Sequence, residues 1–181
     1  MSKPFAFKQF TVEQDRCAMK IGTDGVLLGA WTPITNQTAS ILDIGTGTGI
    51  ISLMVAQRSF AEVIDAIEID TDTYEQAVEN FEASPWGDRL FCYHASFQEF
   101  VAEIDEQYDL LISNPPFYAE DYKTSNKKRD IARFEDVLPF KHLLAGATKL
   151  LSDHGNLALI LPKKEEERIV SLAAHLELYT E

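Results

Sequence analysis

The sequence predicts an α/β fold: a doubly wound, mainly parallel sheet with helices on both faces. Three observations support this prediction. Short apolar runs alternate with segments of helical periodicity, a glycine-rich turn follows the first of these runs, and two prolines end a later one. Strand–helix repetition of this kind produces right-handed βαβ units and a parallel sheet. In such sheets, ligands bind at the carboxyl ends of the strands.

The first half of the chain contains two expected strands and two expected helices. Residues 40–44 form an apolar run that ends in glycines, and the mostly apolar residues 50–58 follow as a helix. Residues 62–69 read Glu-Val-Ile-Asp-Ala-Ile-Glu-Ile and form the expected second strand. Residues 71–83 carry apolar side chains at helical spacing, namely Tyr74, Ala77, Val78 and Phe81.

The second half continues the same alternation after the Ser-Pro-Trp-Gly-Asp break at 84–88. The remaining strands are expected at 89–94, 108–113 and 156–161. Helices are expected at 138–151 and 163–178, and a short helix or turn at 97–106. The last strand is very apolar, and no further strand follows to pair with it. A bare edge of that kind invites aggregation. We therefore expect the natural protein to continue past Glu181.

Composition indicates one globular domain in a reducing, cytoplasmic environment. The chain has 181 residues, of which 45% are hydrophobic and 25% charged. No apolar run approaches the ~20 residues that a membrane helix needs, and the N-terminus lacks a signal-peptide pattern. Cys17 and Cys92 show no metal-binding or redox spacing, so we expect no metal site.

Charge is distributed unevenly along the chain. The formal net charge is −13, which by itself disfavours a polyanionic partner. Residues 61–110, however, hold 14 of the 29 acids against the single cation Arg89, whereas residues 123–133 carry five cations against Asp130. This basic segment directly follows the proline turn. Both a solvated loop and a nucleic-acid contact fit it at this point.

The glycine turn after the first strand favours a nucleoside ligand. It reads Asp43-Ile-Gly45-Thr-Gly47-Thr-Gly49, and Ile50 breaks the dinucleotide fingerprint, while no Walker lysine follows. An acid so close to the first glycine would repel a pyrophosphate. Glu68, at the end of the second strand, is placed to accept both hydroxyls of a ribose. These features suit a nucleoside that carries an amino-acid tail.

The turn Asn114-Pro115-Pro116-Phe117 follows the strand at 108–113. Two prolines cannot continue a sheet ladder or a helix, so an amide, a rigid carbonyl and a ring are left at the strand's carboxyl end. Such groups can hold a flat molecule that bears an NH₂ group. Bases and carboxamides are molecules of this kind.

Together these motifs resemble the class I S-adenosylmethionine-dependent methyltransferases of the amino-methylating branch. The stretch from Lys20 to Trp31 is more specific and is similar to the family of bacterial enzymes that methylate adenine N6 in valine tRNA, at the purine 3′ of the anticodon. The resemblance implies a Rossmann-like methyltransferase fold, S-adenosylmethionine as cofactor, and tRNA as partner. It implies no membrane association, and no obligate protein partner is evident.

The resemblance also assigns residues to roles. The cofactor-binding residues it implies are Lys20, Thr23, Asp43, Gly45, Gly47, Gly49, Glu68, Ser96 and Phe97. Asn114, Pro115 and Phe117 would hold the target amine. The expected RNA contacts are Tyr118, Lys123, Lys127, Lys128, Arg129 and Arg133. Ser96 stands where such families usually place an acid that accepts from the cofactor's adenine amino group.

Residues 1–38 are expected to cover the cofactor site, and residues 39–181 to form the S-adenosylmethionine-binding domain. Trp31 is expected in the core. The C-terminal antiparallel hairpin of the family sheet is missing from the sequence, which again indicates a C-terminally incomplete chain.

Two other functions use the same asparagine turn. The first is glutamine-N5 methylation of release factors, whose enzymes usually have tyrosine in the place of Phe117 and an added N-terminal helical domain. The second is guanine-N2 methylation of ribosomal RNA. A non-catalytic, RNA-binding module of methyltransferase fold is a third alternative.

Overall fold

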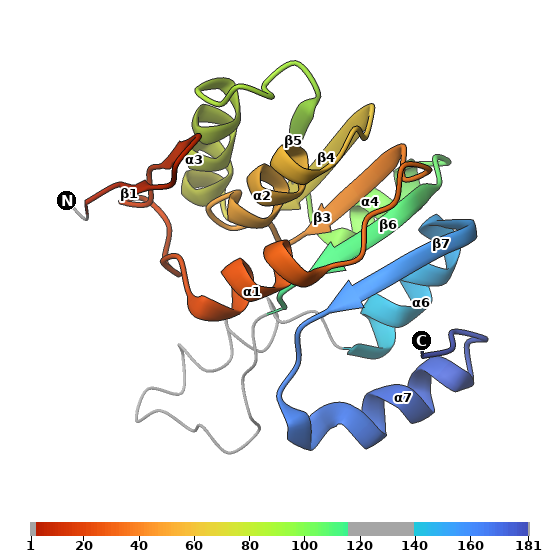
Figure 1. Ribbon diagram of the computed structural model, residues 1–181. Helices are drawn as coiled ribbons and strands as arrows, with labels where there is room; N and C mark the ends of the chain where they lie inside the picture. The colour runs from red at the N-terminus through yellow and green to blue at the C-terminus, as the bar shows by residue number, and fades with distance from the viewer. Residues whose placement is uncertain (1–2, 116–139, 181) are drawn as a thin grey trace, which may run out of the picture.

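The computed structural model describes residues 3–115 and 140–180 (Figure 1). Its main sheet has five strands in the order β5-β4-β3-β6-β7, and every pairing between them is parallel. The strands are β3 (Ser40–Ile44), β4 (Val63–Glu68), β5 (Leu90–His94), β6 (Tyr108–Ser113) and β7 (Leu151–Leu159). The predicted doubly wound, mainly parallel sheet is therefore confirmed.

Helices cover both faces of this sheet (Figure 1). On one face lie α1 (Thr23–Trp31), α2 (Ile50–Arg58) and α3 (Thr71–Glu82). On the other lie α4 (Phe97–Glu103) and α6 (Phe140–Leu150). The short turn η1 (Lys163–Glu165) and α7 (Glu166–Ala174) follow β7, and α7 packs on α6.

The two layers follow from the alternation of side chains along buried strands. In β3, Ile41 faces the cluster beneath α1 and α2, while Leu42 faces the cluster beneath α4 and α6. In β6, Leu110 and Ile112 face the first cluster and Leu111 the second. From β3, the chain adds β4 and β5 on one side and then β6 and β7 on the other. The order of the strands therefore reverses between β3 and β6, which are neighbours at the centre of the sheet. This is the switch point at which α/β sheets bind ligands.

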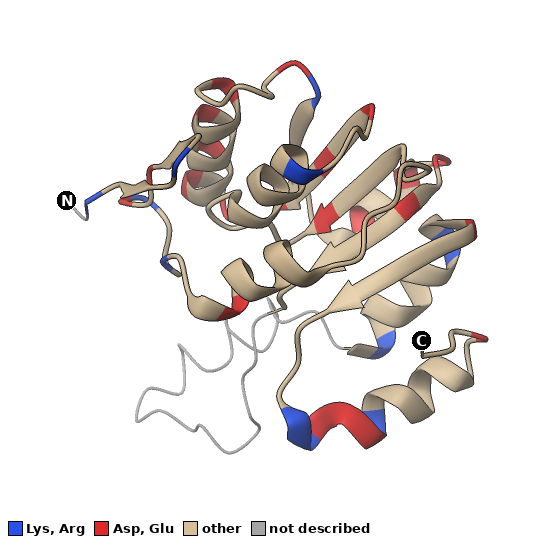
Figure 2. Cartoon of the chain, viewed as in Figure 1, with Lys and Arg blue, Asp and Glu red and all other residues tan. Residues whose placement is uncertain are grey.

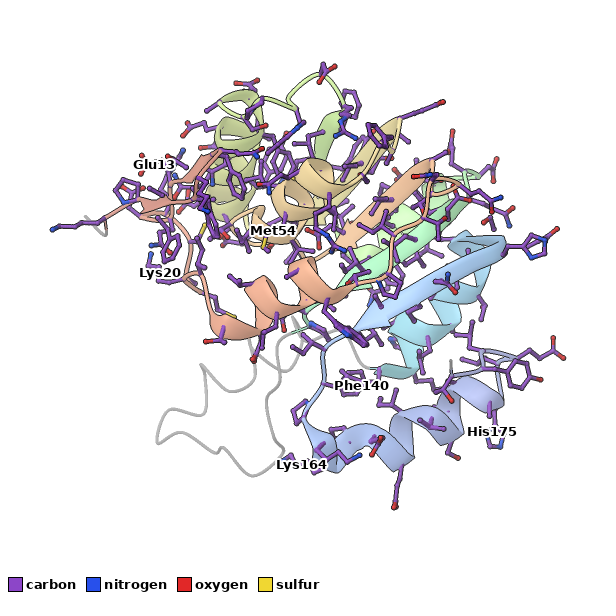
Figure 3. All side chains as sticks on the ribbon, in the orientation of Figure 1. Glu13, Lys20, Met54, Phe140, Lys164 and His175 are labelled. Carbon is purple, nitrogen blue, oxygen red and sulfur yellow. The ribbon has the colours of Figure 1, made fainter. Side chains whose placement is uncertain are left out.

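The helix α1 is absent from the sequence prediction. It packs against α2 through Gly25 and Gly29, one helical turn apart, and a Cβ atom on Gly29 would lie 3.0 Å from Met54 of α2, labelled in Figure 3. Leu28 is buried, but Trp31 is 75% exposed, so its expected place in the core is wrong. Trp31 is the last residue of α1.

The N-terminal residues add a second, two-stranded sheet of β1 (Phe5–Ala6) and β2 (Thr11–Val12), which pair antiparallel. β7 also begins five residues before the predicted strand, directly after α6, and a bulge separates its first pair with β6 from the rest. Within the bulge, a Cβ atom on Gly155 would lie 2.7 Å from the main-chain oxygen of Tyr108. Glycine is needed there because the two backbones approach closely.

None of the described helices is long and apolar enough to cross a membrane.

Candidate functional site

The segments that follow four parallel strands meet at one edge of the sheet. They are the glycine loop after β3, Glu68 at the end of β4, the Ser96 turn after β5 and Asn114 after β6. Backbone bonds join neighbours: the N–H groups of Gly45 and Thr46 both donate to the oxygen of Ile67 at 3.0 Å. The N–H of Ala95, next to Ser96, donates to the main-chain oxygen of Glu68 at 3.2 Å.

The glycine loop presents bare backbone to open space. Gly45, Gly47 and Gly49 have φ angles of 72°, 58° and 80°, a region that L side chains rarely adopt. A Cβ atom on Gly45 or Gly47 would meet nothing within 4 Å, whereas one on Gly49 would lie 2.5 Å from the ring of Phe81. Gly49 is thus required for packing on α3. Gly45 and Gly47 leave room for a ligand to approach the chain.

The carboxylate of Glu68 lies beside this loop. Its Oε2 accepts a 3.0 Å hydrogen bond from the N–H of Gly47. Its Oε1 accepts from the N–H groups of Ile69 and Asp70 at 2.9 and 3.0 Å. These bonds fix the acceptor that the sequence predicts for ribose hydroxyls, and they leave part of its acceptor capacity for a ligand.

Asp43 lies behind the loop and is fully buried. Its Oδ2 accepts 2.7 Å hydrogen bonds from the hydroxyls of Thr46 and Ser52, while Oδ1 has no partner among the described residues. Burial raises the pKa of this carboxyl to about 6, although the two hydroxyls act in the opposite direction. An acid in this position disfavours a phosphate and suits a ligand that brings positive charge.

The turn after β5 holds Ser96, an expected cofactor-binding residue, which caps a helix in this structure. Ser96 is the N-cap of α4: its hydroxyl accepts from the N–H of Glu99 and donates to the Glu99 carboxylate at 2.7 Å. This capping box occupies the hydroxyl that was expected to meet the cofactor's adenine. The ring of Phe97 is buried in the core against α6, so only its backbone is placed near the turn.

Residues 20–22 lead into α1, whose first turn contains Thr23 and Asp24. The ammonium of Lys20, labelled in Figure 3, donates to the main-chain oxygens of Gln14 and, at 2.7 Å, of Cys17. In this structure Lys20 therefore stabilises the fold of the N-terminal segment to which it belongs. Thr23 is exposed at the first turn of α1. Two residues further, the Cβ position of Gly25 lies 3.9 Å from the side-chain nitrogen of Asn114. The glycine of α1 thus allows this helix to pass close to the predicted amine clamp.

Asn114 is half-buried and Pro115 is buried directly after β6. The preceding Ser113 donates a 2.7 Å hydrogen bond to the main-chain oxygen of Ile44, which joins the tips of β6 and β3. Asn114 therefore follows the strand next to the one that carries the glycine loop. The other predicted clamp and RNA residues lie outside the described residues: Phe117, Tyr118, Lys123, Lys127, Lys128, Arg129 and Arg133.

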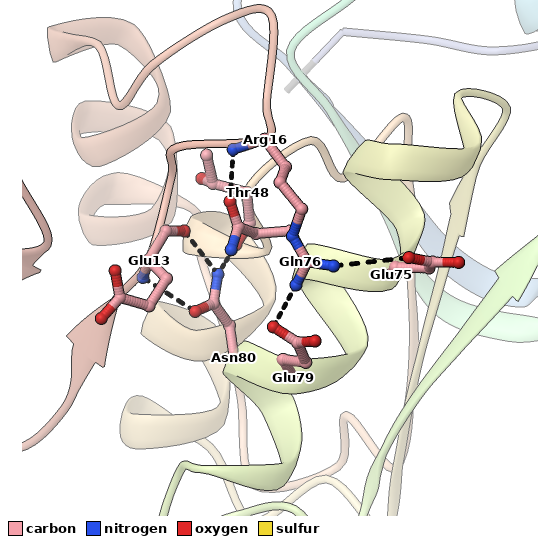
Figure 4. A network of polar contacts seen from close by, with 7 residues as sticks. All are labelled: Glu13, Arg16, Thr48, Glu75, Gln76, Glu79 and Asn80. Atoms are coloured by element: carbon pink, nitrogen blue, oxygen red, sulfur yellow. Dashed lines mark hydrogen bonds and ion pairs between the residues drawn. The ribbon is translucent and has the colours of Figure 1, made fainter. Parts of the chain in front are cut away.

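A buried asparagine that the sequence reading missed joins three segments (Figure 4). The Asn80 side chain on α3 accepts from the N–H of Glu13 at 2.8 Å and donates to the main-chain oxygens of Glu13 and Thr48 at 2.8 and 2.9 Å. Gln76 accepts from the N–H of Arg16 at 2.8 Å. The N-terminal segment, the glycine loop and α3 are thereby held together. The sequence gives little indication of this role, because a polar residue in a helix is as compatible with an exposed position as with a buried one.

Ile69 is a second candidate that the sequence analysis did not name, although the sequence carried a signal for it. It directly follows Glu68, and its side chain is 51% exposed at the ligand edge. An apolar residue that follows a strand-terminal acid offers a flat contact for the face of a base.

Acidic residues dominate the part of the chain around α3 and β4, as Figure 2 shows. The surroundings therefore favour a cationic ligand over a phosphate. Among the described residues, no group of histidine, cysteine and acidic side chains could hold a metal ion.

The fold and the site define a class I S-adenosylmethionine-dependent methyltransferase. The residues present fit that cofactor: the loop offers open backbone at Gly45 and Gly47, Glu68 offers a ribose acceptor, and the part of the glycine loop that the structure describes carries no phosphate-binding lysine. The model of the methyltransferase small domain family matches residues 22–180.

Relatives are similar over most of their length. A tRNA1(Val) (adenine(37)-N6)-methyltransferase of Flavobacterium johnsoniae is 63% identical over 97% of this chain and 74% of its own. One of the same name from Trichodesmium erythraeum is 49% identical over 97% and 74%. A predicted O-methyltransferase of Agrobacterium tumefaciens shares the fold at TM-score 0.63, with 21% identity over 83% of this chain and 66% of that one. The chain belongs to the tRNA1(Val) (adenine(37)-N6)-methyltransferase family, within the methyltransferase small domain family.

Proposed function

We propose that the protein transfers a methyl group from S-adenosylmethionine to the exocyclic N6 amine of an adenine in tRNA. The substrate would be valine tRNA, with the target at the purine 3′ of the anticodon, because the relatives are named for adenine 37. The observation that carries the proposal is the position of Asn114 and Pro115. They follow β6, next to the β3 tip that carries the glycine loop.

Asn114 and Pro115 offer two oxygen acceptors for the two hydrogens of an amine. An aromatic amine is a poor nucleophile because its lone pair is delocalised into the ring. Two acceptors draw the nitrogen toward tetrahedral geometry and direct the lone pair out of the ring plane. When bound, S-adenosylmethionine supplies an electrophilic methyl group, whose bond to sulfur breaks and leaves S-adenosylhomocysteine. The chain then acts mainly by positioning, and the amine proton passes to solvent as the new N–C bond forms.

The remaining parts of the proposal rest on the sequence. Phe117 would stack on the target base, which must turn out of the RNA stack to reach the site. Tyr118 and the cations of residues 123–133 would contact RNA, and residues 1–38 would cover the cofactor. The tie of Asn80 to Glu13 supports the last point, since it brings this segment to the glycine loop. A tRNA substrate also supports a cytoplasmic location, which belongs to this proposal.

A methyl-transfer assay with three substrates tests the function. The protein is incubated with methyl-labelled cofactor and, separately, with undermethylated tRNA, ribosomal RNA or a peptide release factor. We expect label in the tRNA, recovered after digestion as N6-methyladenosine. Label recovered as N2-methylguanosine from ribosomal RNA, or as methylglutamine from the release factor, would overturn the proposal. Transfer to none of them, while the cofactor binds, would indicate a binding module.

A further inference from the structure

The carboxylate of Glu99 lies at the place where the sequence lacks the expected acid. Ser96 donates to Glu99 Oε2 twice, from its N–H at 3.0 Å and from its hydroxyl at 2.7 Å. The Ser96 hydroxyl also accepts from the Glu99 N–H at 3.2 Å. The capping box therefore brings a carboxylate from the first turn of α4 back over residue 96, although Glu99 is three residues further along the chain.

This carboxylate belongs to the edge that carries the nucleoside-binding groups. Ala95, next to Ser96, bonds through its N–H to the backbone of Glu68, whose side chain is the ribose acceptor. Ile69 follows Glu68 and exposes half of its side chain at the same edge. A ribose held at Glu68, with its base over Ile69, would direct the base edge toward the turn at Ser96.

Resting on the proposed function, we propose that Glu99 is a cofactor-binding residue whose carboxylate accepts the N–H of the cofactor's adenine 6-amino group. Ser96 then positions Glu99, and does not bind the base through its own hydroxyl.

The chemistry of the two side chains supports this division. Ser96 already uses its hydroxyl as donor and as acceptor, so little capacity remains for an amine. A carboxylate has about four acceptor sites, of which Ser96 takes two on one oxygen. The hydrogen bonds from Ser96 also lower the pKa of Glu99, so the group is ionised at neutral pH. Hydrogen bonds to an ionised acceptor are about twice as strong as neutral ones.

Calorimetry with the reaction product and one analogue of it tests the assignment. S-adenosylhomocysteine carries the 6-amino group, and its inosine counterpart carries a 6-oxo group that a carboxylate repels. We expect the wild-type protein to bind the adenosine compound about tenfold to a hundredfold more tightly than the inosine compound. Glu99→Gln should shrink this ratio to near one, because an amide can both accept from an amine and donate to a carbonyl.

Two further variants separate recognition from helix capping. Glu103→Gln, on the exposed side of the same helix, should leave the ratio unchanged. The double variant Ser96→Asp with Glu99→Ala should restore the preference, because aspartate both caps the helix and accepts from the amine. Equal loss of affinity for both compounds in Glu99→Gln would show that Glu99 only caps α4. Equal binding by the wild type would overturn this assignment alone, whereas no binding of either compound would overturn the proposed cofactor as well.

Discussion

The side chain of Glu68 accepts a 3.0 Å hydrogen bond from the N–H of Gly47, across the gap between two strand tips. Its other oxygen accepts from the N–H groups of Ile69 and Asp70. The predicted ribose acceptor is therefore also the group that holds the glycine loop in place. A site whose polar groups are fixed before the ligand arrives loses less entropy on binding.

Replacing Glu68 with glutamine should weaken the cofactor site and loosen the loop. The variant Glu68→Gln keeps the size of the side chain but loses the charge that strengthens its hydrogen bonds. We expect S-adenosylhomocysteine to bind about tenfold to a hundredfold more weakly. Amide exchange at Gly47 should also become faster without ligand. Glu75→Gln, on the outer face of α3, should change neither quantity, and unchanged affinity in Glu68→Gln would contradict the ribose role.

Two glycines of the same loop should respond differently to alanine. Gly49→Ala adds a methyl group that would meet Phe81 at a φ of 80°, so we expect a loss of about 2–4 kcal/mol in the free energy of unfolding. Gly47→Ala, at a φ of 58° in open space, should lose only about 1–2 kcal/mol but most of the cofactor affinity. Urea unfolding and calorimetry measure the two effects. Equal destabilisation by both variants would contradict the packing assignment.

The buried acid behind the loop should make stability depend on pH. The folded-state pKa of Asp43 is about 6, above the unfolded value of about 3.9. Between these values the native state binds the extra proton, so the free energy of unfolding falls as pH rises. Relative to Asp43→Asn, the wild type should lose about 2 kcal/mol between pH 4 and pH 6.5, and little more above that range. Urea unfolding of both proteins at each pH measures the difference between their free energies of unfolding. A difference that does not change with pH would show that burial does not raise the pKa of Asp43.

Local patterns were enough to predict the sheet and the glycine loop. The runs at 40–44 and 108–113 coincide with β3 and β6, because a strand buried on both faces is apolar throughout and is bounded by turn residues. The positions of Glu68 and Asn114 at strand ends followed from the same boundaries, since parallel strands bring their carboxyl ends to one edge.

Features that depend on contacts between distant segments were not predicted. The helix α1 carries two glycines and apolar residues on several sides, and becomes recognisable only when α2 lies against Gly25 and Gly29. From the sequence, Ser96 looks like a weak substitute for an acid. In the structure, its hydroxyl is already hydrogen-bonded to the carboxylate of Glu99. The role of Asn80 depends on a segment 67 residues away, a separation that no local pattern encodes.

Removing the Asn80 amide should release the N-terminal segment. Asn80→Ala leaves the part-buried N–H and oxygen of Glu13 and the buried oxygen of Thr48 without this partner. We expect a loss of about 2–4 kcal/mol in the free energy of unfolding and faster amide exchange over residues 13–20. Arg16→Gln removes only exposed ion pairs with Glu75 and Glu79 and should cost less than about 1 kcal/mol. Similar protection of the amides of residues 13–20 from exchange in wild type and Asn80→Ala would show that Asn80 does not hold the N-terminal segment in place.

Asn114 gives the most direct separation of catalysis from binding. It lies beside Gly25 of α1 and follows the strand next to the glycine loop, so its amide can reach a substrate amine without being part of the loop itself. If its oxygen orients that amine, Asn114→Ala should lower kcat by about a hundredfold to ten-thousandfold, because positioning of this kind acts mainly in the transition state. The Kd for S-adenosylhomocysteine should stay within about threefold of wild type, since the lost contact is with the substrate amine and changes the cofactor free energy by less than ~1 kcal/mol. Parallel losses in kcat, cofactor affinity and unfolding free energy would mean instead that Asn114 supports the β6 turn. Asn114→Asp keeps an acceptor oxygen of the same reach, and a rate between those of the wild type and Asn114→Ala would identify the acceptor as the active feature of this side chain.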